Sequence, residues 1–215
     1  VLTEANSNLT HPKFFNHIDR YIFNFSEEDF KTYAPDLLIT IGQNVVSKKI
    51  KQFLRKAKPK NHWHIHEIWQ PDTFFSLTEK IETKPEVFFS KLLPFITLEP
   101  QPYFNLWDVL RDKRDIKHED YCLKAPFSDF KFFEILADKL PETVNLHFSN
   151  SSAIRYAQLF EFKTNSIHCN RGTSGIDGCT STAMGFAMKA KEQTVLVTGD
   201  VSFFYDINGL WNNYI

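Results

Sequence analysis

Residues 194–213, TVLVTGDVSFFYDINGLWNN, contain the stretch that decides the predicted fold. The first four residues are apolar or β-branched, which is typical of a buried parallel strand. The strand ends at Thr198, so Gly199 and Asp200 follow its carboxyl end, where open α/β sheets bind ligands. Asp200 is therefore a candidate Mg²⁺ ligand, because Mg²⁺ prefers carboxylate oxygens and is usually bound together with phosphates. The simpler alternative is that the Gly-Asp pair only begins a helix, with Ser202 as a further candidate cap.

Two polar blocks upstream strengthen the ligand-binding alternative. Residues 150–155 read NSSAIR and residues 170–178 read NRGTSGIDG, and each block follows a short stretch that predicts a strand. The three glycines of the second block allow the backbone to approach a ligand closely. The block matches neither the dinucleotide fingerprint nor the P-loop pattern, which argues against those two nucleotide sites here. Asp177 is a candidate cap for a helix of small residues over 180–189.

In this order the three blocks resemble the cofactor domain of thiamine-diphosphate enzymes. More narrowly, they resemble the 2-succinyl-5-enolpyruvyl-6-hydroxy-3-cyclohexene-1-carboxylate synthase family (MenD) of menaquinone biosynthesis, whose pattern runs NSxxxR, NRGxSGIDG and GDxSFxxDxNGL. The resemblance covers the whole chain, loosely in the first half and closely from Asn150 onward. It implies an α/β fold: a parallel-sheet central domain of transhydrogenase-like type over 1–110, a linker over 111–126, and the start of a second α/β domain, a truncated diphosphate-binding domain, over 127–215.

The resemblance also implies an activity. A transferase of this family decarboxylates 2-oxoglutarate and adds the resulting unit to isochorismate, using thiamine diphosphate and Mg²⁺, with Mn²⁺ as an alternative ion. The family's activating glutamate lies in a domain that this chain lacks, and its second metal ligand, an Asn, lies beyond Ile215; Asn212 and Asn213 are too close to Asp200 to take that place. We therefore expect the chain alone to be inactive and not to retain the cofactor, and a full-length parent to be a homodimer or homotetramer.

The resemblance assigns the site residues in two groups. The cofactor group comprises Ser151, Gly175, Ile176, Gly199, Asp200 and Ser202, with Asp200 on the metal and Ile176 as the bulky apolar residue that props the cofactor in its bent conformation. A cationic group for the substrate carboxylates comprises Arg155, Arg171, Lys48 and Lys49. The family carries Lys-Arg where this chain has Lys48-Lys49, and lysine lacks the bidentate fork of arginine. Without the resemblance, Arg155 would be an ordinary exposed helix residue.

The first half of the chain predicts a strand and a helix in succession. Residues 37–41, LLITI, form a continuous apolar strand, and Ser47 is placed to cap the basic helix KKIKQFLRKAK that follows the turn at Gly42. Most of the basic side chains of this helix are expected to form a solvated face over Ile50, Phe53 and Leu54. Other local signals predict a capping box at 26–29, a helix from Pro85, and a helix capped by Ser128.

His62, His64 and His66 alternate along HWHIH, so in a strand they point to one face. Neutral histidine is a common metal ligand. No residue nearby in the sequence completes a site, however, and we therefore expect a surface or edge strand whose histidines are dispensable.

Composition narrows the class of protein. The chain has 215 residues and a net charge of −1, which gives no reason to expect a nucleic-acid or anionic membrane partner. No apolar run is long enough to span a bilayer, and three cysteines without metal-type spacing fit a reducing cytoplasm. Two alternatives stay open: another thiamine-diphosphate 2-oxoacid decarboxylase or synthase, and a non-catalytic nucleotide-binding module.

Overall fold

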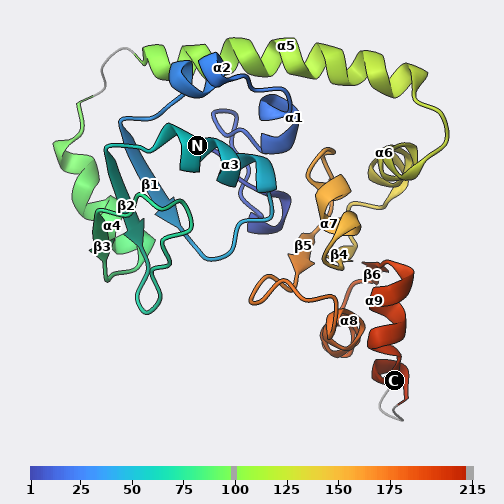
Figure 1. The fold of residues 1–215 in the computed structure, drawn as a ribbon. Coiled ribbons are helices and arrows are strands. Elements are labelled where there is room, and N and C mark those ends of the chain that lie inside the picture. Colours follow the sequence, from blue (N-terminus) through green and yellow to red (C-terminus); the bar gives the residue numbers. More distant parts are fainter. Residues whose placement is uncertain (98–100, 212–215) are drawn as a thin grey trace. The chain divides into compact units, whose positions relative to one another are not determined.

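The computed structural model describes residues 1–97 and 101–211, and it has an α/β fold with two parallel three-stranded sheets (Figure 1). The chain divides into two compact units, one formed by Val1–Tyr21 with Asp115–Ile215 and the other by Ile22–Arg114. The predicted fold class is confirmed. The division of the sequence into a central domain, a linker and a diphosphate-binding domain stays a prediction, and Asn212 and Asn213 lie outside the described residues.

The unit Ile22–Arg114 contains the first sheet. Its strands are β1 (Leu37–Ile41), β2 (Asn61–Ile65) and β3 (Glu79–Ile81), in the order β1-β2-β3. Its helices are α2 (Glu27–Thr32), α3 (Lys48–Ala57), α4 (Pro85–Leu92), η2 (Leu93–Phe95) and the first part of α5 (Pro102–Lys124). The predicted caps are confirmed: Ser26 and Asp29 form a capping box, and Ser47 Oγ accepts a hydrogen bond from Ile50 N at 3.0 Å.

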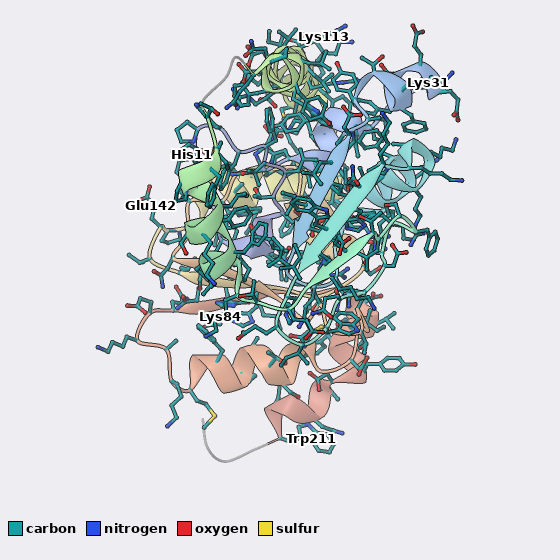
Figure 2. The ribbon with its side chains drawn as sticks, turned by 90° about the vertical axis from the view of Figure 1, so that its left-hand side faces the viewer. His11, Lys31, Lys84, Lys113, Glu142 and Trp211 are labelled. Carbon is teal, nitrogen blue, oxygen red and sulfur yellow. The ribbon has the colours of Figure 1, made fainter. Side chains whose placement is uncertain are left out.

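Aromatic side chains form the core beside α3. Phe53 is 1% exposed, and its ring centroid lies 5.5 Å from that of Phe25, 5.8 Å from that of Phe30 and 6.3 Å from that of Trp107. Edge-to-face and offset aromatic pairs of this kind stabilise a core beyond the burial of their area. The basic residues of α3 lie around this apolar face, as expected, and in Figure 2 the neighbouring helices α2 and α5 likewise direct charged side chains such as Lys113 outward.

The structure corrects the prediction for the histidine row. β2 is the middle strand of its sheet, and His62 and His64 are buried, at 0% and 3% exposure. The hydroxyl of Thr40 on β1 lies 2.8 Å from His62 Nε2 and 2.7 Å from His64 Nδ1. A hydroxyl has one proton, so it donates to one ring and accepts from the other, which makes burial of both rings tolerable. His62 and His64 are therefore part of a core and not of a surface or edge strand, whereas His66 lies just after β2 and is half-buried. Within the described residues no group of three or more His, Cys, Asp or Glu is arranged to hold a metal ion.

Thr40→Val is expected to lower the free energy of unfolding by about 1–3 kcal/mol, because it removes the shared partner of two buried imidazoles without changing side-chain volume. Chemical denaturation followed by circular dichroism measures the change. Thr32→Val on α2 is the matched control, since Thr32 is exposed, and it should stay within about 0.5 kcal/mol of the unmodified protein. Equal effects of the two substitutions would contradict a structural role for the histidine pair.

The second sheet belongs to the unit that contains Asp115–Ile215. Its parallel strands are β4 (Asn145–Phe148), β5 (Ser166–Cys169) and β6 (Thr194–Val197), in the order β5-β4-β6. The other elements are η1 (Ala5–Ser7), the start of α1 (Ile18–Ile22), the end of α5, α6 (Asp129–Lys139), α7 (Ser152–Ala157), α8 (Cys179–Ala187), α9 (Asp200–Tyr205) and η3 (Ile207–Leu210). The sequence located all three strands and the cap at Ser128, whose Oγ accepts from Lys131 N.

β4 is the buried centre of this sheet. All four of its residues are buried, and Phe148 stacks on Phe133 of α6 with ring centroids 6.0 Å apart. β6, in contrast, is half-buried along its whole length, which corrects the prediction of a buried strand over 194–197. β6 is only half-buried because it is the last strand in the order β5-β4-β6, so among the described strands it pairs with β4 on one side only.

His147 and His168 form a stacked pair across β4 and β5. Their ring centroids are 4.7 Å apart, and the Phe186 ring of α8 lies 4.9 Å from the first and 4.8 Å from the second. Burial, together with the neighbouring His168, lowers the pKa of His147 to about 4, and burial also lowers the pKa of His168. Both rings are therefore neutral at pH 7 in the folded chain.

This pair makes the fold acid-sensitive. Because the pKa of His147 is about 4 when folded and 6.5 when unfolded, the unfolded chain binds more protons between those values. Stability is fully present above pH 6.5 and is lost as the pH falls toward 4. We expect His147 alone to account for about 2 kcal/mol between pH 7 and pH 5. Thermal melting across this range, compared with His147→Gln, measures the contribution; an identical pH dependence of the two proteins would refute it.

Candidate functional site

The three polar blocks of the sequence meet at one edge of the second sheet. The register places Cys169, Phe148 and Val197 in one row at the carboxyl ends of β5, β4 and β6. Three loops leave this row, and we call residues 149–151, 170–178 and 198–200 the carboxyl-edge loops. The chain passes from β4 to β5 on one side and then crosses to β6 on the other, so the strand order reverses at β4. Ligands of open α/β sheets bind at such a reversal.

Asn150 joins two of the carboxyl-edge loops and is 3% exposed. Its Nδ2 donates to the carbonyl oxygens of Asn170 and Gly175, both at 2.6 Å, and its Oδ1 accepts from Arg171 Nη1 at 2.7 Å. Burial raises the pKa of the Cys169 thiol to about 12, so this group stays protonated and its Sγ donates to the same Oδ1 at 3.5 Å. The amide therefore fixes both the loop backbone and the Arg171 guanidinium.

Ser202, on the helix α9 that follows β6, makes the corresponding contact. Its hydroxyl donates to the Ile176 carbonyl at 2.6 Å, and the residue is 3% exposed. The prediction of Ser202 as a helix cap is wrong, because α9 already begins at Asp200, with Gly199 at the N-cap, and Ser202 lies inside the helix. Its hydroxyl serves the loop around Ile176 instead.

Asp200 is an exposed carboxylate at the carboxyl end of β6. Oδ1 accepts from Val201 N at 2.8 Å, and within the described part of the chain Oδ2 has no hydrogen-bond or ion-pair partner. A strand-end carboxylate with an uncommitted oxygen suits Mg²⁺, which takes one or two protein carboxylates and completes its shell with phosphate and water. The residues present at this edge thus fit a metal-bound diphosphate.

The glycine-rich loop surrounds a hollow of about 360 Å³. It is lined by Asn170, Gly172, Thr173, Gly175, Asp177 and Gly178. Gly178 has φ +70° and is the N-cap of α8, so the prediction of Asp177 as the cap is wrong. The Asp177 carboxylate instead folds back over Gly175, where an added Cβ would lie 2.2 Å from Oδ1. A side chain at position 175 would therefore require the Asp177 carboxylate to move.

Ser151 and Arg155 lie at the two ends of one turn of α7. Ser151 precedes the helix with φ 73° and ψ −126°, a conformation that costs energy in a residue other than glycine and is concentrated at functional sites. Arg155 is exposed and makes no hydrogen bond or ion pair within the described residues. Its guanidinium is thus available to an anionic ligand.

Two polar residues of the site were missed by the sequence predictions. One is Asn150, which had no predicted role beyond its place in the NSSAIR block. The other is Asp206. Its Oδ2 accepts from Ser181 N and its Oδ1 from Ser181 Oγ, both at 2.6 Å, and these bonds join the end of α9 to the start of α8, which lies beside it in Figure 1. The sequence signal available for Asn150 and Asp206 was their place at element ends within the polar blocks. Gly209 packs against the same serine, since an added Cβ would lie 2.7 Å from Ser181 Oγ.

Lys48 and Lys49 belong to the other unit, at the first turn of α3. Lys48 is exposed and has no partner within the described residues, and Lys49 Nζ lies 5.2 Å from the centroid of the Phe23 ring. Backbone N–H groups at a helix N-terminus favour anions. That these lysines share a site with the arginines remains a prediction.

Comparison with known proteins identifies the family. No protein-family model matches the chain. The 2-succinyl-5-enolpyruvyl-6-hydroxy-3-cyclohexene-1-carboxylate synthase of Flavobacterium psychrophilum is 50% identical over 216 residues, which cover 100% of this chain and 39% of the relative. The synthase of the same name from Christiangramia forsetii is 47% identical over 100% of the chain, and that of Bacteroides thetaiotaomicron is 40% identical over 98%. The chain belongs to this synthase family. It spans about two fifths of the length of these synthases (39% of the first).

The family resemblance stated from the sequence is thereby confirmed. Within the described residues no helix is both long and apolar enough to cross a membrane. The three cysteines are free thiols.

Proposed function

We propose that this chain forms the diphosphate- and metal-binding part of a thiamine-diphosphate-dependent transferase, 2-succinyl-5-enolpyruvyl-6-hydroxy-3-cyclohexene-1-carboxylate synthase. The supporting observation is the convergence of Asn150, Arg171, Ile176 and Asp200 at one carboxyl edge, in a chain 50% identical to a synthase of that name. The substrates are 2-oxoglutarate and isochorismate. The enzyme is cytoplasmic and a homodimer or homotetramer.

The cofactor-binding residues have distinct roles in this proposal. Asp200 holds Mg²⁺ through its uncommitted oxygen, and Gly199 lets the backbone approach the diphosphate. Gly175 keeps the loop free of a side chain, Ile176 supports the cofactor from its apolar side, and Ser151 offers a hydroxyl beside α7. When bound, thiamine diphosphate supplies the carbanion chemistry, while the protein supplies placement and charge.

The cationic residues bind the carboxylates of the two substrates. Arg171 is held in place by Asn150, whereas Arg155 is exposed and unengaged, so the first is preorganised and the second can adapt to the ligand. Charge-assisted hydrogen bonds from arginine to carboxylate are among the stronger polar contacts in proteins. Lys48 and Lys49 add charge from the other unit.

The experiment is made on the full-length protein, meaning this chain within a protein of its relatives' length. It is supplied with thiamine diphosphate, Mg²⁺, 2-oxoglutarate and isochorismate, and the succinylated product is detected by mass spectrometry. Pyruvate replaces 2-oxoglutarate in a parallel reaction. Product formation with 2-oxoglutarate and not with pyruvate supports the proposal. A preference for pyruvate would assign the chain to another 2-oxoacid decarboxylase or synthase.

Lys49→Arg tests the paired lysines. Because it introduces the bidentate fork that the family carries, we expect kcat/KM for 2-oxoglutarate to be unchanged or to rise by up to about threefold. The side chain is exposed, so the fold should accommodate arginine. A fall of more than about tenfold, with an unchanged melting temperature, would show that a compact ammonium is required at this position.

A further inference from the structure

Two consecutive peptide carbonyls of the glycine-rich loop are held by side chains from two different strand ends. Asn150, after β4, donates to the carbonyl of Gly175, and Ser202, after β6, donates to the carbonyl of Ile176, each at 2.6 Å. We propose that Asn150 and Ser202 are positioning residues, which hold the backbone of Gly175 and Ile176 between them and, through Asn150, orient Arg171. This inference rests on the proposed function.

The orientation of the Asn150 amide is determined by its partners. Nδ2 faces two carbonyl oxygens, so only the NH₂ group can occupy that place, and Oδ1 then faces the guanidinium of Arg171. The two donor bonds and the charge-assisted bond leave this buried side chain a single orientation. Arg171 and the backbone of Gly175 are therefore fixed by the same amide.

Ser202 acts through the loop and not as a donor to phosphate. A serine hydroxyl has one proton, and here that proton is directed at the Ile176 carbonyl. A diphosphate oxygen accepts hydrogen bonds and would need a donor, which this hydroxyl no longer offers. Ser202 is thus assigned to the placement of Ile176, while its neighbours at the start of α9 remain available to a diphosphate.

The loop needs such support because its own sequence gives it little. Glycines at 172, 175 and 178 leave the backbone many accessible conformations, and ordering them costs free energy. Ser174, directly before the held carbonyls, has φ 65°, which is unfavourable for a residue with a Cβ. External hydrogen bonds that hold this conformation place Ile176 and Arg171 before a ligand arrives.

The test compares Asn150→Ala and Ser202→Ala with two matched controls in the full-length protein. Asn145 is the first residue of β4, the strand that precedes Asn150, and it is also buried, at 2% exposure, but its Oδ1 accepts from Asn165 and Ser166 at the opposite edge. Ser128 caps α6 outside the carboxyl-edge loops, and its hydroxyl donates to the carbonyl of Pro126 at 3.0 Å. Asn145→Ala and Ser128→Ala therefore remove comparable polar groups without touching Gly175 or Ile176.

The first measurement is hydrogen exchange of the backbone amides of residues 171–177, without any ligand. We expect exchange to be at least about tenfold faster in Asn150→Ala and Ser202→Ala than in the controls, because the loop opens locally. Amides of β4 serve as the internal reference for global unfolding. Unchanged exchange in the loop would overturn the proposal, whatever the activity of the protein.

The second measurement is steady-state kinetics with thiamine diphosphate, Mg²⁺ and both substrates. A misplacement of about 1 Å costs up to about a hundredfold, so kcat/KM should fall about ten- to hundredfold in the two variants and by less than about threefold in the controls. Asn150→Ala should also raise the KM for substrate, whereas Ser202→Ala should mainly weaken cofactor binding. Faster exchange without any kinetic change would overturn the positioning role.

An inactive unmodified protein would instead refute the proposed function, and the exchange data would still decide whether the two residues hold the loop.

Discussion

Asp200→Ala is expected to abolish Mg²⁺-dependent binding of thiamine diphosphate in the full-length protein, with an affinity loss of more than about a hundredfold. The magnitude follows from the small number of protein ligands that Mg²⁺ uses beside phosphate and water. Among the described residues Asp200 supplies the exposed carboxylate at the carboxyl end of β6, and one of its oxygens is uncommitted. Titration of the cofactor with and without Mg²⁺, followed by tryptophan fluorescence, measures the loss.

The same substitution should leave the fold intact. Within the described chain the Asp200 side chain makes one hydrogen bond, from Val201 N to Oδ1, so its removal should cost no more than about 1 kcal/mol of stability. Asp206→Ala is the matched control for stability, at the C-cap of the same helix. Both oxygens of Asp206 are engaged by Ser181, and we expect that variant to lose about 1–3 kcal/mol of stability. Unchanged cofactor affinity in Asp200→Ala would show that Asp200 only begins α9.

Arg171→Ala and Arg155→Ala are expected to lower kcat/KM by about ten- to hundredfold, since charge-assisted contacts contribute about 1.5–3 kcal/mol each. Arg171 should give the larger fall, because Asn150 holds its guanidinium and little further ordering is needed on binding. Cofactor affinity should change by less than about twofold, because the metal at Asp200 neutralises most of the diphosphate charge. Steady-state kinetics with each substrate varied in turn separates the two arginines.

Lys163→Ala is the control for a general loss of positive charge, since Lys163 is exposed in the same unit and lies outside the carboxyl-edge loops. Its kinetics should match those of the unmodified protein. If the arginine variants instead weaken cofactor binding and leave both substrate KM values unchanged, the arginines serve the diphosphate and not the substrates.

Local signals in the sequence predicted most of the secondary structure. Ser26, Ser47 and Ser128 each accept the expected backbone hydrogen bond at a helix start, because capping depends on residues within one turn of one another. The strands before the three polar blocks were equally evident, since each has apolar residues at alternating or successive positions and ends at a polar turn. The convergence of the blocks at one edge then follows from parallel pairing alone.

Features that depend on the order of strands could not be predicted in this way. The alternation HWHIH is typical of a half-exposed strand, yet β2 lies in the middle of its sheet, and the Thr40 hydroxyl satisfies two buried rings from a neighbouring strand. The apolar run at 194–197 is typical of a buried strand, yet β6 has one described neighbour. The local periodicity of the sequence predicts neither the burial of the two histidines nor the partial exposure of β6.

Contacts between distant segments of the site could not be predicted from the local sequence either. Asn150 and Ser202 lie within the motifs, but their hydrogen bonds to a loop more than twenty residues away form only when three strand ends meet. Ser202 looked like a helix cap because it lies close to the helix start. The structure directs its hydroxyl to Ile176 instead.

The most direct test of the central claim is a crystal structure of the full-length protein with thiamine diphosphate and Mn²⁺, in which anomalous scattering locates the metal. We expect a metal peak about 2.0–2.2 Å from an Asp200 carboxylate oxygen, with the diphosphate bound to the same ion and the cofactor in contact with Ile176. A metal bound away from Asp200, or a cofactor that leaves the loop of residues 170–178 untouched, would contradict it.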